Sequence, residues 1–209
     1  MVADSEKDQT LTIASPTSKE SGSQKMKLTR NLREPLKSVK GLFYCVLYLG
    51  PGAYHRIHAP SDWKIRLRRH FAGKLCPVND RAVRTVKNLY VVNERVVLEG
   101  EWSQGLMAMA AVGATNVGSI EIKLEPELKT NLPLFGKELQ SIVTMQKYGS
   151  NGEGYNVNAG DEVALFNLGS TVVLVFEAPV GETEGNKEGF SFMLEKGQHV
   201  KMGELIGHW

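Results

Sequence analysis

The sequence predicts a mainly β fold, a sandwich or barrel with a few short helices, which a looser classification would call α+β. Three observations lead to this prediction: the apolar segments are short, glycine-containing turns separate them, and little of the chain has helical periodicity. The chain has 209 residues, of which 42% are hydrophobic and 23% charged. These values are typical of one soluble domain with a well-filled core.

The first 38 residues differ in composition from the rest of the chain. They are rich in Ser, Thr, Lys, Glu and Asp and show no sustained hydrophobic period. Such a segment buries too little apolar surface to offset the entropy lost on ordering. We therefore expect residues 1–38 to be a disordered arm or linker, and residues 39–209 to form the domain.

The strands are predicted by apolar runs and by alternation. Residues 42–49 form a continuous apolar and aromatic run before Gly50-Pro51-Gly52, as in a strand buried on both faces. Residues 64–68 alternate with period two, as in a half-buried strand. Asp80 is a candidate cap for a short helix in which Val83, Val86 and Leu89 share a face. The remaining predicted strands are residues 96–98, 106–112, 120–124 and 171–176, the last being the most β-prone.

Charge and composition exclude several classes of protein. A formal net charge of +2 is too small to indicate a nucleic-acid binder. Cys45 and Cys76 lie in apolar surroundings and are interpreted as small buried hydrophobic residues. No segment approaches the ~20 apolar residues that span a bilayer, and the acidic start does not resemble a targeting peptide. The chain is therefore expected to be soluble, and at a membrane it would act peripherally.

Two histidines lie three residues apart, directly after the Gly-Pro-Gly turn. His55 and His58 would point to opposite faces of a strand but could converge in a turn. A histidine pair suits proton transfer because its unperturbed pKa, roughly 6.5, lies near neutral pH. Taken alone, the pair is more simply explained by hydrogen-bonded histidines at a strand end. No metal site is predicted, since no cysteine is near and His70 is a distant third ligand.

A Gly-Ser pair precedes the last predicted strand and has an unusual chemical option. Gly169 permits a strained backbone, so that the Ser170 hydroxyl can attack the Gly169 carbonyl and convert the peptide bond into an ester. Elimination and hydrolysis would then leave a pyruvoyl group at residue 170. Both steps need a general base beside the serine.

The segment 168–171, Leu-Gly-Ser-Thr, resembles the self-cleavage motif of the phosphatidylserine decarboxylases, and residues 54–60 resemble their histidine motif. Residues 93–97 and 112–120 resemble two further blocks of that family, in the same order and spacing. The similarity extends from about Gly41 to the C-terminus and is strongest to the mitochondrial-type enzymes of eukaryotes.

The resemblance implies a role for each residue of these motifs. Ser170 would be the nucleophile of self-cleavage and then the pyruvoyl cofactor, His58 the base of the processing triad, and His55 a proton donor or acceptor in decarboxylation. Cleavage after Gly169 would give a β chain ending there and an α chain of residues 170–209. The substrate would be phosphatidylserine, the products phosphatidylethanolamine and carbon dioxide, and the location the mitochondrial inner membrane.

The chain departs from the family pattern in two places. The family's processing aspartate belongs to an upstream Ser-Pro-x-Asp-Gly motif that this chain does not contain, and Ala53 stands where the family usually has Asp. An aspartate that fixes the histidine tautomer is worth about 10⁴-fold in the serine-protease triad. We therefore expect slow processing, and the hypothesis follows that this chain is the C-terminal part of a longer enzyme without its first strands and anchor.

Two alternatives and one surface prediction remain open. The chain could be an inactive fragment or pseudoenzyme of the same family. It could also be a lipoyl- or biotinyl-like module, because Gly160-Asp161-Glu162-Val163 is echoed by Gly197-Gln198-His199-Val200, as in two similar hairpins packed together.

A basic patch is predicted to face either solvent or an anionic membrane surface. At such a surface each basic residue would contribute ~1 kcal/mol of electrostatic attraction. The patch comprises Lys64, Arg66, Arg68, Arg69 and Lys74.

Overall fold

A computed structural model of the chain describes residues 8–14, 39–115, 117–132, 143–168, 171–181 and 189–209. The strands are β1 (Asp8–Ala14), β2 (Lys40–Tyr48), β3 (Arg56–His58), β4 (Trp63–Phe71), β5 (Arg95–Trp102), β6 (Gly105–Val112), β7 (Ile120–Ile122), β8 (Val143–Lys147), β9 (Tyr155–Val157), β10 (Glu162–Phe166), β11 (Thr171–Pro179), β12 (Ser191–Phe192), β13 (His199–Lys201) and β14 (Gly207–His208). The helices are α1 (Asp80–Thr85) and α2 (Leu89–Val92). The predicted mainly β class is confirmed.

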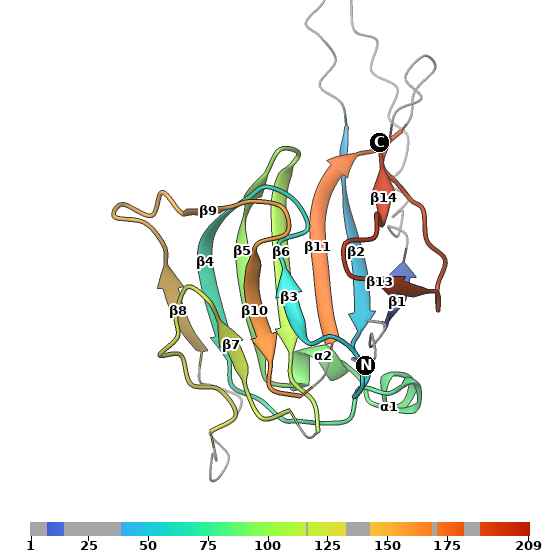
Figure 1. Cartoon of the computed structure of the whole chain (residues 1–209), viewed down its shortest axis with the longest axis vertical. Helices are drawn as coiled ribbons and strands as arrows, with labels where there is room; N and C mark the ends of the chain where they lie inside the picture. Colours follow the sequence, from blue (N-terminus) through green and yellow to red (C-terminus); the bar gives the residue numbers. More distant parts are fainter. Residues whose placement is uncertain (1–7, 15–38, 116, 133–142, 169–170, 182–188) are drawn as a thin grey trace, which may run out of the picture.

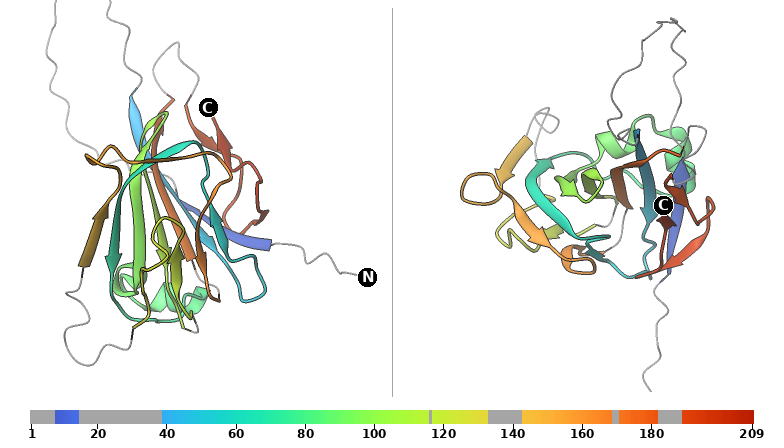
Figure 2. Two further views of the ribbon diagram at one scale, coloured as in Figure 1. Left: turned by 60° about the vertical axis from the view of Figure 1, so that its left-hand side comes forward. Right: turned by 90° about the horizontal axis from the view of Figure 1, so that it is seen from above.

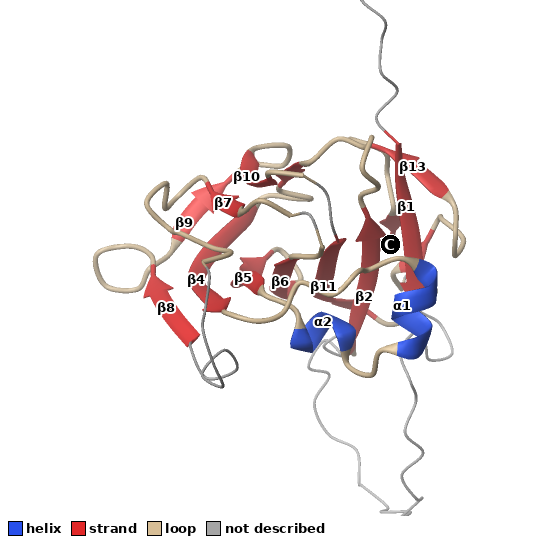
Figure 3. Cartoon of the chain, turned by 90° about the horizontal axis from the view of Figure 1, so that it is seen from below, coloured by secondary structure: helices blue, strands red, loops and turns tan. Residues whose placement is uncertain are grey.

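The strands form one large sheet and two small ones. The large sheet has the order β13-β1-β2-β11-β6-β5-β4-β8, with β9 also paired to β4. A three-stranded sheet, β3-β10-β7, lies in front of it (Figure 1), and the view from above in Figure 2 separates the two as layers. β12 and β14 form the third sheet. Both helices lie together at one end of the large sheet (Figure 3).

Apolar side chains from the two facing layers fill one core. Alternate residues of β2, β11, β6 and β5 point inward, because successive side chains of a strand point to opposite faces. The three-stranded sheet supplies the opposing side chains. The core includes Phe43, Cys45, Val96, Leu98, Met107, Met109, Leu174 and Phe176 from the large sheet, and Ile57, Ile120, Ile122, Val163 and Phe166 from the small one.

Three sequence predictions about elements need correction. The run at 42–49 is buried on both faces only in its second half, since Leu42 and Tyr44 are exposed on one face, whereas Val46 on that same face is buried. The cap of α1 is Asn79, whose side chain accepts a hydrogen bond from the Ala82 backbone at 3.0 Å, because the helix begins at Asp80 itself. Residues Asp8–Ala14, inside the predicted arm, form β1 and pair with β2 and β13. Their Thr-Leu-Thr-Ile alternation is a strand signal that composition obscured.

The predicted basic patch is largely neutralised by pairing. A register shift between Ile65 and Leu67, where β4 pairs with β5, breaks the alternation of β4 and turns Arg68 into the interior. There Arg68 forms a two-pronged ion pair with Glu125, and the Tyr148 hydroxyl donates to the same carboxylate at 2.6 Å. Arg66 pairs with Glu101 at 2.9 Å and Arg69 with Glu99 at 3.1 Å. The prediction of a solvent- or membrane-facing position was therefore wrong for Arg68, whereas Arg66 and Arg69 lie on the surface in ion pairs.

The echoed segments do not form a repeated hairpin. Glu162 and Val163 begin β10, which pairs with β3 and β7 in the small sheet. His199 and Val200 belong to β13, which pairs with β1 in the large sheet. The equivalent positions thus have different neighbours, which argues against the lipoyl- or biotinyl-like interpretation. Among the described residues, no helix is long and apolar enough to cross a bilayer.

The two cysteines should differ in reactivity. Cys45 is fully buried, and burial raises the pKa of its thiol to about 12, whereas Cys76 is half-buried. Because the thiolate is the reactive form, we expect a thiol reagent at pH 8 to modify Cys76 in the folded protein and Cys45 only after denaturation. Mass spectrometry of labelled peptides would measure this. Equal labelling of both thiols in the folded protein would contradict the packing of β2 against β11.

Candidate active site

The histidine motif lies along the edge of the three-stranded sheet. β3 carries His58 at its end, and His55 immediately precedes it. Residues of β3 pair with β10 in antiparallel register, with His58 opposite Glu162 and Arg56 opposite Leu165. The His55 carbonyl then accepts a hydrogen bond from the Phe166 backbone at 3.0 Å. The motif therefore runs beside β10 as far as the last residue of that strand.

Both ring nitrogens of His58 have hydrogen-bond partners. Nδ1 lies 2.7 Å from the Gly160 carbonyl oxygen and Nε2 lies 2.8 Å from the Tyr54 hydroxyl. Since a carbonyl can only accept, Nδ1 must carry the proton. In the neutral imidazole, Nε2 therefore holds the lone pair and accepts from Tyr54, whose ring also stacks on the imidazole. The neutral His58 ring is thus held in the tautomer that has its lone pair on Nε2.

The Gly160 carbonyl is held in place by a tight turn. Gly160 has φ +88°, a backbone conformation that glycine adopts without a steric cost. Two backbone hydrogen bonds of 2.8 Å tie the turn to Ala59, from Gly160 N to Ala59 O and from Ala59 N to Asp161 O. The Asp161 side chain accepts from the Asn158 backbone at 2.7 Å. The turn therefore fixes the tautomer of His58 without a carboxylate.

Glu162, which lies opposite His58 in the strand pairing, is bound to cationic side chains and not to the imidazole. Glu162 forms ion pairs with Arg56 at 2.6 Å and with Lys123 at 3.0 Å. Burial opposes its ionisation, but hydrogen bonds from Lys123 and Arg56 outweigh that effect and lower the pKa of Glu162. The same contact with Glu162 raises the pKa of Arg56. Glu162 is therefore ionised and bound by two cations, and it does not orient His58.

The segment after β10 is bound on its other side by residues 118–121. Asn167 donates its backbone N–H to the Ser119 carbonyl at 3.0 Å and accepts from the Gly118 N–H at 2.7 Å. Its side-chain amide donates to Ser119 Oγ at 2.6 Å and to Glu121 Oε1 at 2.5 Å. The next residue, Leu168, has φ +80°. The end of β10 thus lies between the histidine motif and the 112–120 block.

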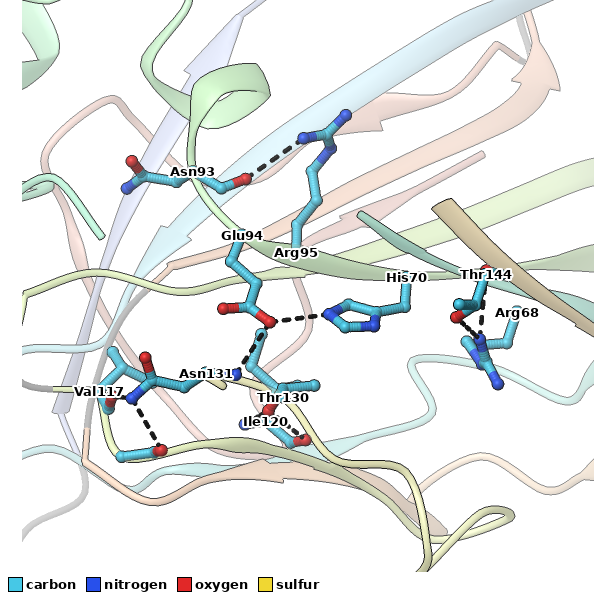
Figure 4. Close-up of polar contacts among 11 residues, drawn as sticks. Arg68, His70, Asn93, Glu94, Arg95, Val117, Ile120, Thr130, Asn131 and Thr144 are labelled. Carbon is cyan, nitrogen blue, oxygen red and sulfur yellow. Dashed lines mark hydrogen bonds and ion pairs between the residues drawn. The ribbon is translucent and has the colours of Figure 1, made fainter. Parts of the chain in front are cut away.

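The 93–97 block is joined to the same region through a buried polar cluster (Figure 4). Glu94 Oε1 accepts from the Asn131 backbone at 2.9 Å and lies 2.7 Å from His70 Nε2. The Asn131 side-chain amide donates to the carbonyls of Val117 at 2.9 Å and Gly118 at 3.0 Å. The Glu94 carbonyl also accepts from Gly113 N. Hydrogen bonds therefore connect the 93–97 block, the 112–120 block and the histidine motif through the end of β10, and Thr171 of the 168–171 block pairs with Val112.

An apolar cavity of about 490 Å³ opens beside His58. It lies within the size range of roughly 300–1,000 Å³ typical of small-molecule sites. Side chains of the large sheet and of the C-terminal segment supply most of its lining, while His58 and Gly160 bring polar atoms to it. The main apolar lining residues are Leu47, Leu49, Met107, Met109, Val172, Leu174, Phe176, Ile206 and Trp209.

The structure thus brings together some of the predicted site residues and leaves others out. His55 and His58 lie on the same side of β10, whereas Gly169 and Ser170 lie outside the described residues. His70 is paired with Glu94. The sequence pattern did not indicate Tyr54, Gly160 and Asn131 as partners of the site. Asn131 adopts φ +54°, a backbone conformation that asparagine tolerates better than most residues. Its residue type was therefore the only hint in the sequence, and it is a weak one.

Comparison with known proteins agrees with this geometry. Residues 3–208 match the phosphatidylserine decarboxylase family. The chain is 53% identical to a mitochondrial phosphatidylserine decarboxylase proenzyme 1 of Arabidopsis thaliana, over 85% of this chain and 40% of that protein. It is 44% identical to the Cricetulus griseus mitochondrial proenzyme and to the Saccharomyces cerevisiae proenzyme 1, over 79% of this chain and 38% and 32% of theirs. It thus spans two fifths or less of these relatives, and it belongs to the phosphatidylserine decarboxylase family.

Proposed function

We propose that this chain forms the self-processing, pyruvoyl-dependent catalytic unit of a phosphatidylserine decarboxylase, which releases carbon dioxide and forms phosphatidylethanolamine. The observation that carries the proposal is the hydrogen-bonded convergence of the histidine motif and the 112–120 block on the segment that ends at Leu168. That segment leads directly to the predicted cleavage site. A structural role alone would not require both blocks at one strand end.

His58 is proposed to be the base of self-processing. Its Nε2 holds a lone pair because Nδ1 donates to Gly160. This tautomer control is the part of the aspartate's role that matters most in the serine-protease triad. In this chain the Gly160 carbonyl therefore supplies the orienting role that the family pattern assigns to an aspartate. For Nε2 to accept a proton, Tyr54 must turn its hydroxyl away or pass a proton on.

His55 is proposed to face the pyruvoyl group derived from Ser170. Its Nδ1 is buried and has no hydrogen-bond partner among the described residues. A buried nitrogen without a partner is costly and is usually satisfied by a ligand or water. A pyruvoyl carbonyl, or a substrate proton, would suit it. When formed, the group supplies an electron sink for decarboxylation, while His55 would hold or move a proton beside it.

The substrate proposal rests on the family and on the apolar cavity. Phosphatidylserine would place a fatty acyl chain among the apolar lining residues while its headgroup lies toward His58. The relatives are mitochondrial proenzymes, and we propose the mitochondrial inner membrane as the location. The chain would contact anionic lipid peripherally, and the β chain ending at Gly169 would stay bound to the α chain through the pairing of β11 with β2 and β6.

The intact mass of the denatured protein tests this function. We expect two polypeptides that divide between Gly169 and residue 170, the second beginning with a pyruvoyl group. The Ser170→Ala variant should remain one chain, because alanine has no hydroxyl to attack the peptide bond. A single uncut chain in the parent protein, with an unmodified Ser170, would overturn the proposal. Release of labelled carbon dioxide from phosphatidylserine would then test the second step.

A further inference from the structure

Leu168 adopts a conformation that is rare for a residue with a β-carbon. Its φ is +80°, and it is one of three non-glycine residues with positive φ in the described part of the chain; the other two are asparagines. Asparagine tolerates this region, whereas leucine does not. The Leu168 side chain is exposed, so burial of that side chain does not explain the conformation. The conformation must therefore come from constraints on the backbone.

Asn167 provides the constraint on the N-terminal side. Its backbone and side chain make four hydrogen bonds to residues 118–121, between 2.5 and 3.0 Å. The approach is close, since a β-carbon on Gly118 would lie 3.0 Å from the Asn167 carbonyl oxygen. Asn131 in turn fixes Val117 and Gly118 from behind (Figure 4). On the C-terminal side, Thr171 is fixed between Tyr48 and Val112 of the neighbouring strands.

We propose that Asn167 and Leu168 are positioning residues that store backbone strain and release it in the first step of self-cleavage. This inference depends on the proposed function. In that step Ser170 Oγ bonds to the Gly169 carbonyl carbon, the Gly169–Ser170 C–N bond breaks, and the hydroxyl proton passes to the freed nitrogen. The main-chain path between the two residues then runs through Oγ and Cβ and is one atom longer. A longer path lets Leu168 leave its unfavourable φ, so strain in the peptide favours the ester.

Two substitutions at residue 168 separate strain from side-chain contacts. Leu168→Ala and Leu168→Gly both remove the exposed side chain, but only glycine adopts φ +80° without a steric cost. Leu168→Ala keeps the unfavourable backbone conformation and is therefore the reference for Leu168→Gly. Leu168→Gly should be slower by a factor of roughly 5 to 150, the range that corresponds to the usual strain of one such residue. Equal rates for the two variants would overturn the inference.

The rate is measured by adding hydroxylamine to the full chain. Hydroxylamine cleaves the ester to leave a hydroxamate on Gly169 and a free Ser170 amine, so that intact mass reports the first step without the later elimination. The thermal midpoint of each variant is recorded in parallel. A general loss of structure would lower the midpoint and the rate together. The inference requires Leu168→Gly to lose rate while its midpoint stays at or above that of Leu168→Ala.

A double-mutant cycle tests the role of Asn167. Asn167→Ala removes the side-chain amide and should slow ester formation in the parent, because the segment can then relax. In the Leu168→Gly background the same substitution should have no further effect, since no strain remains to be held. Additive effects of the two substitutions would overturn the coupling. If the parent itself gives no ester, the proposed function fails. If the parent forms the ester at the same rate as Leu168→Gly, the proposed function stands and only the strain inference fails.

Discussion

Replacing His58 by alanine is expected to slow self-processing by roughly 10²–10⁴-fold, the usual contribution of a positioned general base. The imidazole is oriented by Gly160 at Nδ1 and presents Nε2 as the basic atom. Of the two histidines beside β10, only His58 has hydrogen-bond partners at both ring nitrogens among the described residues, since His55 Nδ1 has none there. The half-time for conversion of one chain into two, followed on a denaturing gel, would measure the effect.

Tyr54→Phe is the matched control for His58→Ala. It keeps the ring that stacks on the imidazole but removes the hydroxyl that donates to Nε2. If His58 is the base, the phenylalanine variant should process at least as fast as the parent, because the lone pair on His58 Nε2 no longer accepts a hydrogen bond from Tyr54. A parent-like rate in His58→Ala would contradict the assignment. Loss of processing in both variants would instead show that the Tyr54 hydroxyl carries the proton.

Replacing Glu125 by glutamine is expected to lower the free energy of unfolding by about 3–5 kcal/mol, the usual cost of removing one partner of a buried ion pair. Arg68 and Glu125 have side chains that are only 6% and 10% exposed, so Arg68 would keep a charge in the interior without a counter-ion. Urea unfolding at pH 7 would measure the change. The effect on activity should follow the loss of folded protein.

Glu101→Gln is the control for Glu125→Gln. It removes the partner of Arg66, also on β4, but these two side chains are 43% and 57% exposed. An exposed pair contributes about 0–1 kcal/mol, because water and salt screen it. Equal destabilisation by the two substitutions would contradict the inward turn of Arg68 at the β4 register shift.

The Arg68–Glu125 pair also predicts how stability depends on pH. Burial opposes ionisation of Glu125, but hydrogen bonds from Arg68 and Tyr148 outweigh it and lower its pKa. The contribution of this carboxylate is therefore fully present above its unfolded pKa, about 4.3, and is lost as pH falls through the lower folded value. Unfolding free energies measured between pH 6 and pH 3 should fall less steeply in Glu125→Gln than in the parent.

The sequence alone predicted the β class, most strands and the family. These follow from local patterns: apolar alternation specifies strands, and ordered short motifs identify relatives without reference to shape. The histidine pair was also found this way. What the local pattern could not supply was the partner of each residue, because those partners lie far away in the chain. Gly160, for example, is 102 residues from His58, and Asn131 is 37 residues from Glu94.

Tertiary structure decided which predicted residues act together. Period-two alternation put Arg68 on the same face as Arg66, and the sheet reversed this with one register shift that also paired Arg68 with Glu125. Likewise, nothing local indicated that a carbonyl would orient His58 or that Asn167 would be held by four hydrogen bonds. The sequence determined the elements and their chemistry through nearest-neighbour preferences. Strand pairing determined the site, because only pairing brings β3, β7 and β10 within hydrogen-bond distance.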